Sequence, residues 1–257
     1  MQITICKTPE EASRLAGEIV NNAIKKNPKL VLGLATGSTP LLLYKEMYTA
    51  CKAGLSYKKV RTFNLDEYYG LPVEKPQSYR SFMNENLFNH LDIDMKNTHV
   101  PDGLAKDVEK SCAQYEKMMK AAGGVDIQVL GIGGDGHIGF NEPGSSLVSR
   151  THLVTLTPRT IKDNTRFFTK SSEVPRYAIS MGVGTVMEAK CCLMLCFGKN
   201  KADAVKGMIE GGVSQFCPAS ALQYHPNTIV FIDEAAASKL TLKAYYKWAC
   251  QHPAKLN

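Results

Sequence analysis

The stretch from Gly131 to Pro143 holds the densest group of chemically capable side chains in the sequence. It reads Gly-Ile-Gly-Gly-Asp-Gly-His-Ile-Gly-Phe-Asn-Glu-Pro and places His137 between Asp135 and Glu142. Glycines let a backbone fold tightly around a small molecule, and an imidazole beside carboxylates can be held in one tautomer and titrate near neutrality. We therefore predict that His137 transfers protons. A histidine with a purely structural role in a loop is the alternative.

A second acidic group follows the strand expected at 60–65. Asp66 and Glu67 stand there, directly before Tyr68 and Tyr69. A carboxylate that is partly shielded from water has a raised pKa and can take a proton from carbon. We predict this role for Asp66. As an alternative, Asp66 caps a helix and Glu67 faces solvent.

Small hydroxylic residues and two cations could bind a phosphate group. The turn Thr36, Gly37, Ser38 and Thr39 lies between a predicted strand and a predicted helix, where backbone N–H groups at the positive helix end favour anions. The alternative is a tight turn with a Ser or Thr N-cap and proline at the first helical position. The turn lacks the Gly-Lys-Ser/Thr ending of a nucleotide P-loop.

Arg166 and Lys201 are the cationic candidates for the same phosphate. Arginine offers a planar fork of donors and lysine a point charge, and both suit a phosphate beside a helix N-terminus. Each of them taken singly is more often an ordinary surface charge.

Short β-rich runs alternate with helical patterns along the chain, which predicts an α/β fold with a mostly parallel sheet. The expected strands are 2–6, 30–34, 60–65, 126–132, 152–156, 177–181, 192–197 and 228–232. The expected helices are 9–27, 41–52, 199–210 and 218–224. The candidate residues follow strand ends, and ligands bind at the carboxyl edge of such sheets. Segment 156–177 carries Arg166, so closure of this segment as a lid would couple to phosphate binding.

The bulk composition excludes several classes of protein. The 257 residues are 44% hydrophobic and 21% charged, which predicts one globular domain over 1–257. No apolar run is long enough for a membrane helix and no signal pattern opens the chain, so we predict a cytoplasmic protein without a membrane partner. The eight cysteines lack metal-ligand spacing and are expected as buried free thiols. The formal charge of +7 is scattered, which favours an anionic small molecule over nucleic acid.

At these residues the sequence resembles the glucosamine-6-phosphate deaminase (isomerase) family over nearly its whole length. The motifs that carry the resemblance, in chain order, are Thr36-Gly-Ser-Thr-Pro40, Phe63-Asn-Leu-Asp-Glu-Tyr68, Gly134-Asp-Gly-His-Ile-Gly-Phe-Asn-Glu-Pro143, Ser149-Arg-Thr151, Arg166-Phe-Phe168, Gly182-Val-Gly-Thr185 and Leu222-Gln-Tyr-His-Pro226.

The resemblance implies a Rossmann-like α/β fold with helices on both faces of the sheet and no metal or organic cofactor. It implies conversion of glucosamine 6-phosphate and water to fructose 6-phosphate and ammonium. Asp66 would take the C2 proton and return one to C1, and His137 would open the pyranose ring with Asp135 and Glu142 orienting it. The phosphate would lie on the Ser38 and Thr39 turn, Arg166 and Lys201.

Two departures from the family pattern limit this assignment. Regulated members use basic residues after the Ser-Arg-Thr motif to hold an N-acetylated effector, whereas His152 and Val154 stand here. We therefore predict little activation by N-acetylglucosamine 6-phosphate. The stretch Gln215-Phe-Cys-Pro218 replaces a common His-Met-Trp, so a homo-oligomer is left open and the hexamer of regulated relatives is not assumed.

Two other functions compete with deamination. A 6-phosphogluconolactonase is similar in fold and shares the Gly-Asp-Gly-His loop. The deaminase is favoured by Asn141-Glu-Pro143 and Asn64-Leu-Asp-Glu-Tyr68. A non-catalytic sugar-phosphate sensor of the transcription-regulator type would carry a helix-turn-helix. The strand expected at 2–6 leaves no room for one, and all four catalytic positions are filled.

Overall fold

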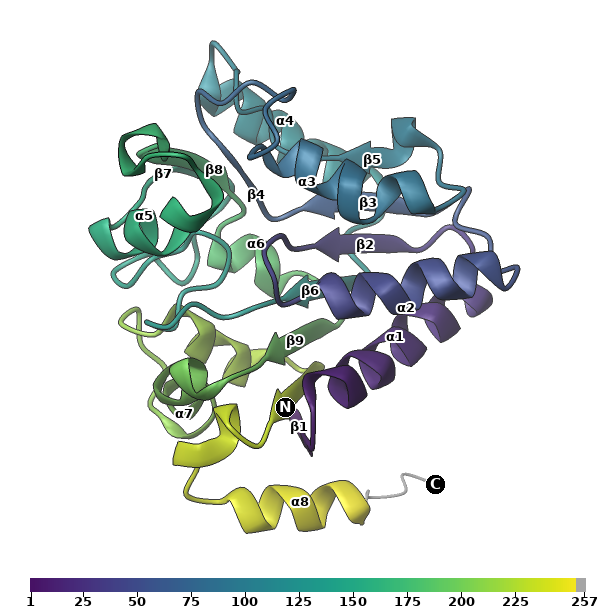
Figure 1. Cartoon of the computed structure of the whole chain (residues 1–257), viewed down its shortest axis with the longest axis vertical. Coiled ribbons are helices and arrows are strands. Elements are labelled where there is room, and N and C mark those ends of the chain that lie inside the picture. The colour runs from purple at the N-terminus through teal and green to yellow at the C-terminus, as the bar shows by residue number, and fades with distance from the viewer. Residues whose placement is uncertain (253–257) are drawn as a thin grey trace.

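Seven parallel strands form the centre of this computed structural model, which describes residues 1–252 (Figure 1). Their spatial order is β1 (Gln2–Cys6), β10 (Thr228–Asp233), β9 (Cys192–Cys196), β6 (Ile127–Leu130), β2 (Val31–Leu34), β3 (Arg61–Asn64) and β5 (Thr98–His99). From β2 the chain builds outward through β3 to β5, and from β6 it builds the opposite way through β9 and β10. The strand order therefore reverses between β2 and β6, which is where such sheets bind ligands.

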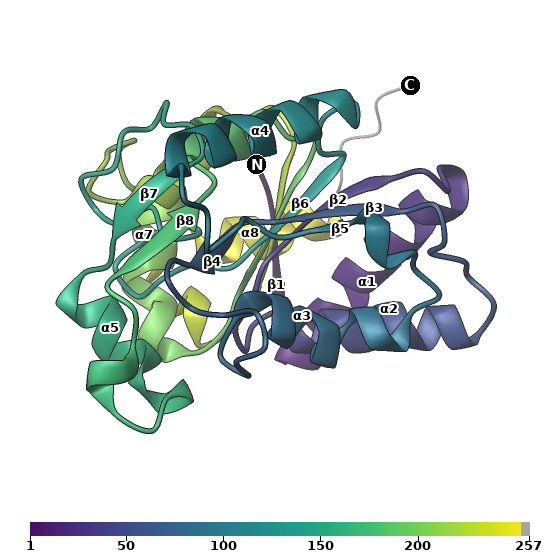
Figure 2. The same ribbon diagram turned by 90° about the horizontal axis from the view of Figure 1, so that it is seen from above.

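Helices cover both faces of this sheet, as Figure 2 shows for α4 above the strands and α1 to α3 below them. One face carries α1 (Pro9–Lys26), α2 (Leu41–Lys52) and α3 (Tyr79–Asn86), and the other carries α4 (Val108–Ala121), α6 (Val183–Met187) and α7 (Ala202–Glu210). The last helix, α8 (Lys243–Gln251), lies beside β1. Because both faces are covered, β2, β6 and β9 are buried at every position and read as apolar runs.

A second, three-stranded antiparallel sheet lies beside the carboxyl edge of the first. It consists of β4 (Asp66–Tyr68), β8 (Tyr177–Ser180) and β7 (His152–Thr155), with α5 (Pro158–Asn164) next to it. The strands expected at 152–156 and 177–181 therefore exist, but they do not belong to the parallel sheet. In β7 only Val154 is buried, and such one-sided burial is typical of an antiparallel sheet with one face toward solvent.

The helices and the cysteines bear on two expectations from composition. No helix among the described residues is long and apolar enough to cross a membrane. All eight cysteines are free thiols, and five of them are buried as predicted, namely Cys6, Cys112, Cys191, Cys192 and Cys196. Cys51 and Cys217 are only partly covered, and Cys250 is exposed on α8.

Candidate active site

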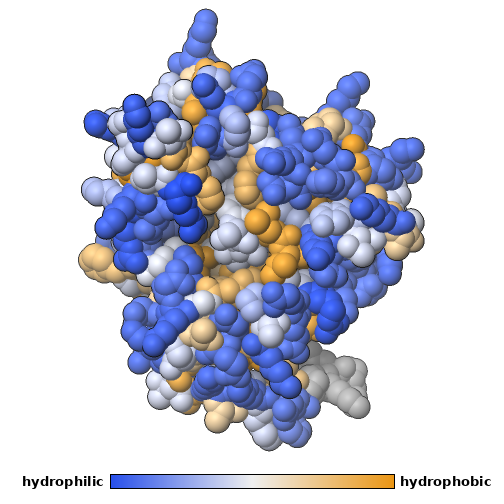
Figure 3. Space-filling view, viewed as in Figure 1, coloured by the Kyte–Doolittle hydropathy of each residue, from blue (hydrophilic) through white to orange (hydrophobic). Residues whose placement is uncertain are grey.

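A cavity of about 770 Å³ opens at the carboxyl edge of the parallel sheet, next to the ends of β2 and β6. The predicted site residues that line it are Thr36, Gly37, Ser38, Thr39, Asp66, His137, Arg166 and Lys201. Figure 3 shows a hollow on this face, with pale residues of intermediate hydropathy at its floor, apolar residues along its sides and hydrophilic residues around them. The sheet topology thus brings together residues that lie up to 165 positions apart.

The turn after β2 leaves the N-terminus of α2 accessible to an anion. Pro40 occupies the N-cap of α2 and no side chain caps the first turn, so the N-cap role considered for Ser38 or Thr39 is wrong. Gly37 has a φ of +90°, which only glycine adopts without strain. The first N–H groups of α2 are therefore not taken up by a capping side chain.

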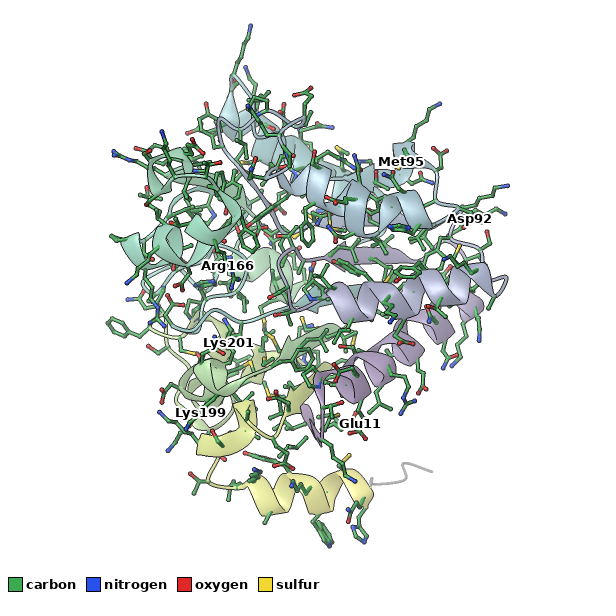
Figure 4. The ribbon with its side chains drawn as sticks, in the orientation of Figure 1. Glu11, Asp92, Met95, Arg166, Lys199 and Lys201 are labelled. Carbon is green, nitrogen blue, oxygen red and sulfur yellow. The ribbon has the colours of Figure 1, made fainter. Side chains whose placement is uncertain are left out.

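Two cations line the cavity together with this turn. Arg166 lies in a short 3-10 helix after α5, with its guanidinium 4.8 Å from the ring centre of Phe167. Lys201 is the N-cap residue of α7, and burial lowers the pKa of its ammonium group. Figure 4 shows them reaching the same edge of the sheet from different elements. Neither forms an ion pair within residues 1–252, so both are available to a phosphate.

His137 is held by two carboxylates behind the cavity wall. Its Nδ1 lies 2.7 Å from Oδ1 of Asp135 and 3.3 Å from Oε2 of Glu142, and its backbone N–H donates to Asp135. Burial alone would lower the pKa of His137, but the hydrogen bonds to the two acids outweigh burial and raise it to about 9. Asp135 and Glu142 do not themselves line the cavity. From outside the cavity, the two carboxylates orient the His137 ring and favour its protonated form.

Glu142 links His137 to the start of α5. Its Oε1 accepts hydrogen bonds from the backbone N–H and hydroxyl of Thr157 and from the hydroxyl of Thr160 at the start of α5.

The side chains of Asp135, His137 and Glu142 each offer one atom within 4.8 Å of the others, a spacing that a metal site can also have. Because Nδ1 and Oδ1 stand at hydrogen-bond distance, a cation between them would have to displace the proton. We interpret the cluster as a proton-bearing group.

Asp66 is the other titratable group of the cavity and is only 5% exposed. Burial and the neighbouring charge of Glu67 raise its pKa to about 8, although His137 opposes the shift. The loop after His137 approaches it closely, because a Cβ added to Gly139 would lie 3.4 Å from Oδ2 of Asp66. A carboxylate with a raised pKa therefore faces the same cavity as a charged imidazole.

Sequence reasoning missed an aromatic wall beside Asp66. The rings of Tyr79 and Phe140 stack at 5.9 Å, and the ring of Tyr68 lies 4.8 Å from Tyr79. All three residues line the cavity. Tyr79 is the first residue of α3, a helix that the sequence pattern did not predict, so its place in the site could not be foreseen. Phe140 stands inside the glycine-rich motif and could have been considered.

Gly133→Ala is expected to lower kcat by about 10²-fold or more, because a Cβ at this position would lie 2.3 Å from Cε1 and Nδ1 of His137 and displace the ring. Steady-state kinetics with thermal unfolding measures the effect. Gly212→Ala is the matched control, since its Cβ would meet nothing within 4 Å and Gly212 has no positive φ. Equal kcat values for the two variants would contradict the assigned position of His137.

The family model described as glucosamine-6-phosphate isomerases/6-phosphogluconolactonase matches residues 7–231. The chain belongs to this family. The family resemblance inferred from the motifs is thereby confirmed.

The family description names two activities, and the relatives described by each of them differ in their similarity to this chain. Glucosamine-6-phosphate deaminases of Shewanella woodyi and Cellvibrio japonicus are each 52% identical over 248 residues, covering 96% of this chain and 94% of theirs. A solved structure described as a monomeric glucosamine-6-phosphate deaminase has a TM-score of 0.91 at 44% identity, covering 93% of this chain and 99% of its own. The 6-phosphogluconolactonase from Trypanosoma cruzi has a TM-score of 0.75 at 22% identity, a likeness of fold alone.

Proposed function

We propose that this protein is an enzyme that converts glucosamine 6-phosphate and water to fructose 6-phosphate and ammonium. The observation that carries the proposal is the content of one cavity, in which Asp66 and the carboxylate-bound His137 share the walls with an uncapped helix end and two cations that pair with no acid among the described residues. The deaminase relatives at about 50% identity over nearly the whole chain support the same substrate.

His137 is assigned to ring opening. The closed sugar has no acidic C–H bond, so the ring oxygen must first gain a proton while the C1 hydroxyl loses one, which breaks the bond from C1 to the ring oxygen and leaves C1 as an aldehyde carbon. Nδ1 faces the carboxylates of Asp135, at 2.7 Å, and Glu142, at 3.3 Å, which leaves Nε2 as the nitrogen that can serve the substrate. Because its pKa is raised to about 9, His137 carries the proton needed for this step at neutral pH.

Asp66 is assigned to the transfer of hydrogen between carbons. Once C1 is an aldehyde carbon, the carboxylate can take the C2 proton while a proton reaches the C1 oxygen, which gives an enolamine, and the carboxyl group can then deliver its proton to C1. The C–N bond at C2 then becomes an imine, and water hydrolyses it to the ketone and ammonia. A buried carboxylate suits this task because its raised pKa makes it a stronger base than an exposed one.

The phosphate is assigned to the turn Thr36 to Thr39, Arg166 and Lys201. A phosphate held there is remote from the reacting carbons, so its binding energy serves to orient the sugar. The finer assignments of all these side chains, Asp135 and Glu142 included, remain predictions from the family motifs.

A paired assay tests the function against the lactonase alternative. Glucosamine 6-phosphate and 6-phosphogluconolactone are each supplied at the same concentration, and ammonium release and lactone loss above the spontaneous rate are followed. We expect ammonium release and no accelerated lactone hydrolysis. Lactone hydrolysis without ammonium would replace the proposal, and binding of the sugar phosphate without either reaction would indicate a sensor.

N-acetylglucosamine 6-phosphate is expected to leave the half-saturation concentration for substrate unlowered. Val154 is buried in a small apolar cluster, and Nδ1 of His152 lies 2.7 Å from the carbonyl oxygen of Arg150. Arg150 itself is paired with Glu116 and Glu188. These positions offer an effector phosphate no free cation on β7. Initial rates across a range of effector concentrations measure this, and a several-fold fall in half-saturation would contradict it.

The segment Gln215 to Pro218 contacts the loop of His137 within the same chain. A Cβ on Gly136 would lie 2.6 Å from Sγ of Cys217, and the N–H of Ala219 donates to the carbonyl oxygen of Gly136 at 2.9 Å.

We propose a cytoplasmic enzyme and leave its subunit number open.

A further inference from the structure

Glu67 follows Asp66 in the sequence, and the proposed mechanism does not explain why its side chain is buried. It is only 1% exposed, although the sequence allowed a solvent-facing side chain at this position. Its Oε1 accepts the backbone N–H groups of Tyr68 at 2.8 Å and Tyr79 at 2.9 Å, and its Oε2 accepts that of Arg80 at 2.9 Å. Glu67 forms no ion pair within residues 1–252. A carboxylate this deeply buried is costly unless its charge is used or well compensated.

The first turn of α3 supplies that compensation. Tyr79 and Arg80 are the first two residues of α3, and Ser78 is its N-cap. The positive end of a helix and its unpaired N–H groups favour the ionised form of a carboxylate. Gly103 closes the other side, because a Cβ there would lie 3.1 Å from Cγ of Glu67 and 2.3 Å from the carbonyl oxygen of Tyr68. The Glu67 carboxylate is thus clamped in one place.

We propose that Glu67 is a positioning residue whose fixed negative charge beside Asp66 strengthens Asp66 as a base and whose hydrogen bonds hold Tyr79 in the cavity wall. This rests on the proposed function of Asp66. Glu67 does not line the cavity, so it acts through Asp66 and α3 and does not touch the substrate.

The other charged groups near these two acids do not cancel this effect. His137 from the loop after β6 opposes it and is already included in the raised pKa of Asp66. Burial raises the pKa of Glu67, and the three backbone N–H groups oppose this shift. The charge of Arg80, whose guanidinium is hydrogen-bonded to Thr98, also favours the ionised form of Glu67. The remaining titratable groups around Asp66 are phenols whose pKa values burial raises, so they stay neutral: Tyr44, Tyr68, Tyr79 and Tyr115.

The test compares Glu67→Gln, which removes the charge, with Glu67→Asp, which keeps it. The readout is the pH at which kcat/KM falls on the acid side, where Asp66 becomes protonated. Removing a like charge makes Asp66 easier to ionise, so Glu67→Gln is expected to move this limb down by about one pH unit or more. Glu67→Asp should lower kcat through longer hydrogen bonds while leaving the limb in place.

Glu116→Gln is the matched control. Glu116 is also partly buried and accepts hydrogen bonds from Thr151 and Thr185, but it lies away from this cavity. Its substitution should not move the limb. If Glu67→Gln lowers kcat with the limb unmoved, Glu67 is merely structural and the proposal is overturned.

Carbon NMR titration of the carboxyl groups needs neither turnover nor a stable Glu67→Gln variant. In the native protein Glu67 should stay ionised through the pH range in which Asp66 takes up its proton. A Glu67 that is protonated before Asp66 would overturn the proposal. Because this result does not depend on catalysis, it separates failure of the Glu67 proposal from failure of the proposed function.

Discussion

Replacing Asp66 by asparagine is expected to lower kcat for glucosamine 6-phosphate by about 10² to 10⁴-fold while leaving substrate binding nearly unchanged. Asparagine keeps the shape of the side chain but cannot accept the C2 proton. The phosphate-binding groups belong to other elements and remain intact. Steady-state kinetics together with calorimetric titration of the substrate measures the two effects separately.

Asp92→Asn provides the control for this substitution. Asp92 also accepts hydrogen bonds, from Ser56 and from the backbone of Tyr57, and Figure 4 shows it at the opposite side of the molecule from Arg166. Its substitution should cost stability and leave kcat unchanged. A native kcat in Asp66→Asn would remove Asp66 from the mechanism.

The native pH profile adds a sign to this prediction. The pKa of Asp66 is raised to about 8, so the basic carboxylate is present above that pH and is lost as the pH falls through it. The pKa of His137 is raised to about 9, so its proton is present below that pH and is lost as the pH rises through it. A bell-shaped profile with its optimum between these values follows.

Replacing His137 by glutamine is expected to lower kcat by about 10² to 10⁴-fold and to abolish the alkaline limb of the pH profile. Glutamine fills similar space but cannot carry a proton to the ring oxygen. The acid limb belongs to Asp66 and should remain, displaced only by the loss of the imidazolium charge. Because His137 now favours ionisation of Asp66, its removal should move that limb upward.

Gly212→Ala again serves as a neutral comparison for folding, and thermal unfolding checks that His137→Gln is intact. An alkaline limb that persists in His137→Gln would assign that limb to another group. A kcat within a few-fold of the native value would exclude ring opening by His137.

The sequence predicted the elements whose apolar pattern is continuous. The bounds expected for β1 and α2 agree with the structure, and α1 ends one residue before the expected limit. The residues at the ends of β2 and β6 were placed correctly because parallel strands share one carboxyl edge. The strands β4 and β5 were missed, since three and two residues carry too little pattern to recognise.

The environment of Glu67 could not be predicted, for a different reason. Two of its three hydrogen-bond partners lie 12 and 13 positions later, in a helix rich in polar residues, Tyr79 to Asn86. Asparagine and serine are weak helix formers, so nothing local predicted α3. The buried state of Glu67 depends on where that helix packs, which is a property of the whole fold. The antiparallel pairing of β7 and β8 is tertiary information of the same kind.

The most direct test of the account is a proton NMR time course of glucosamine 6-phosphate with the native protein and with Asp66→Asn at the same concentration. We expect fructose 6-phosphate and ammonium in equal amounts from the native protein, and bound but unconverted substrate from Asp66→Asn. Native protein that binds the substrate and leaves it unchanged, or an Asp66→Asn variant that converts it at the native rate, would contradict the account.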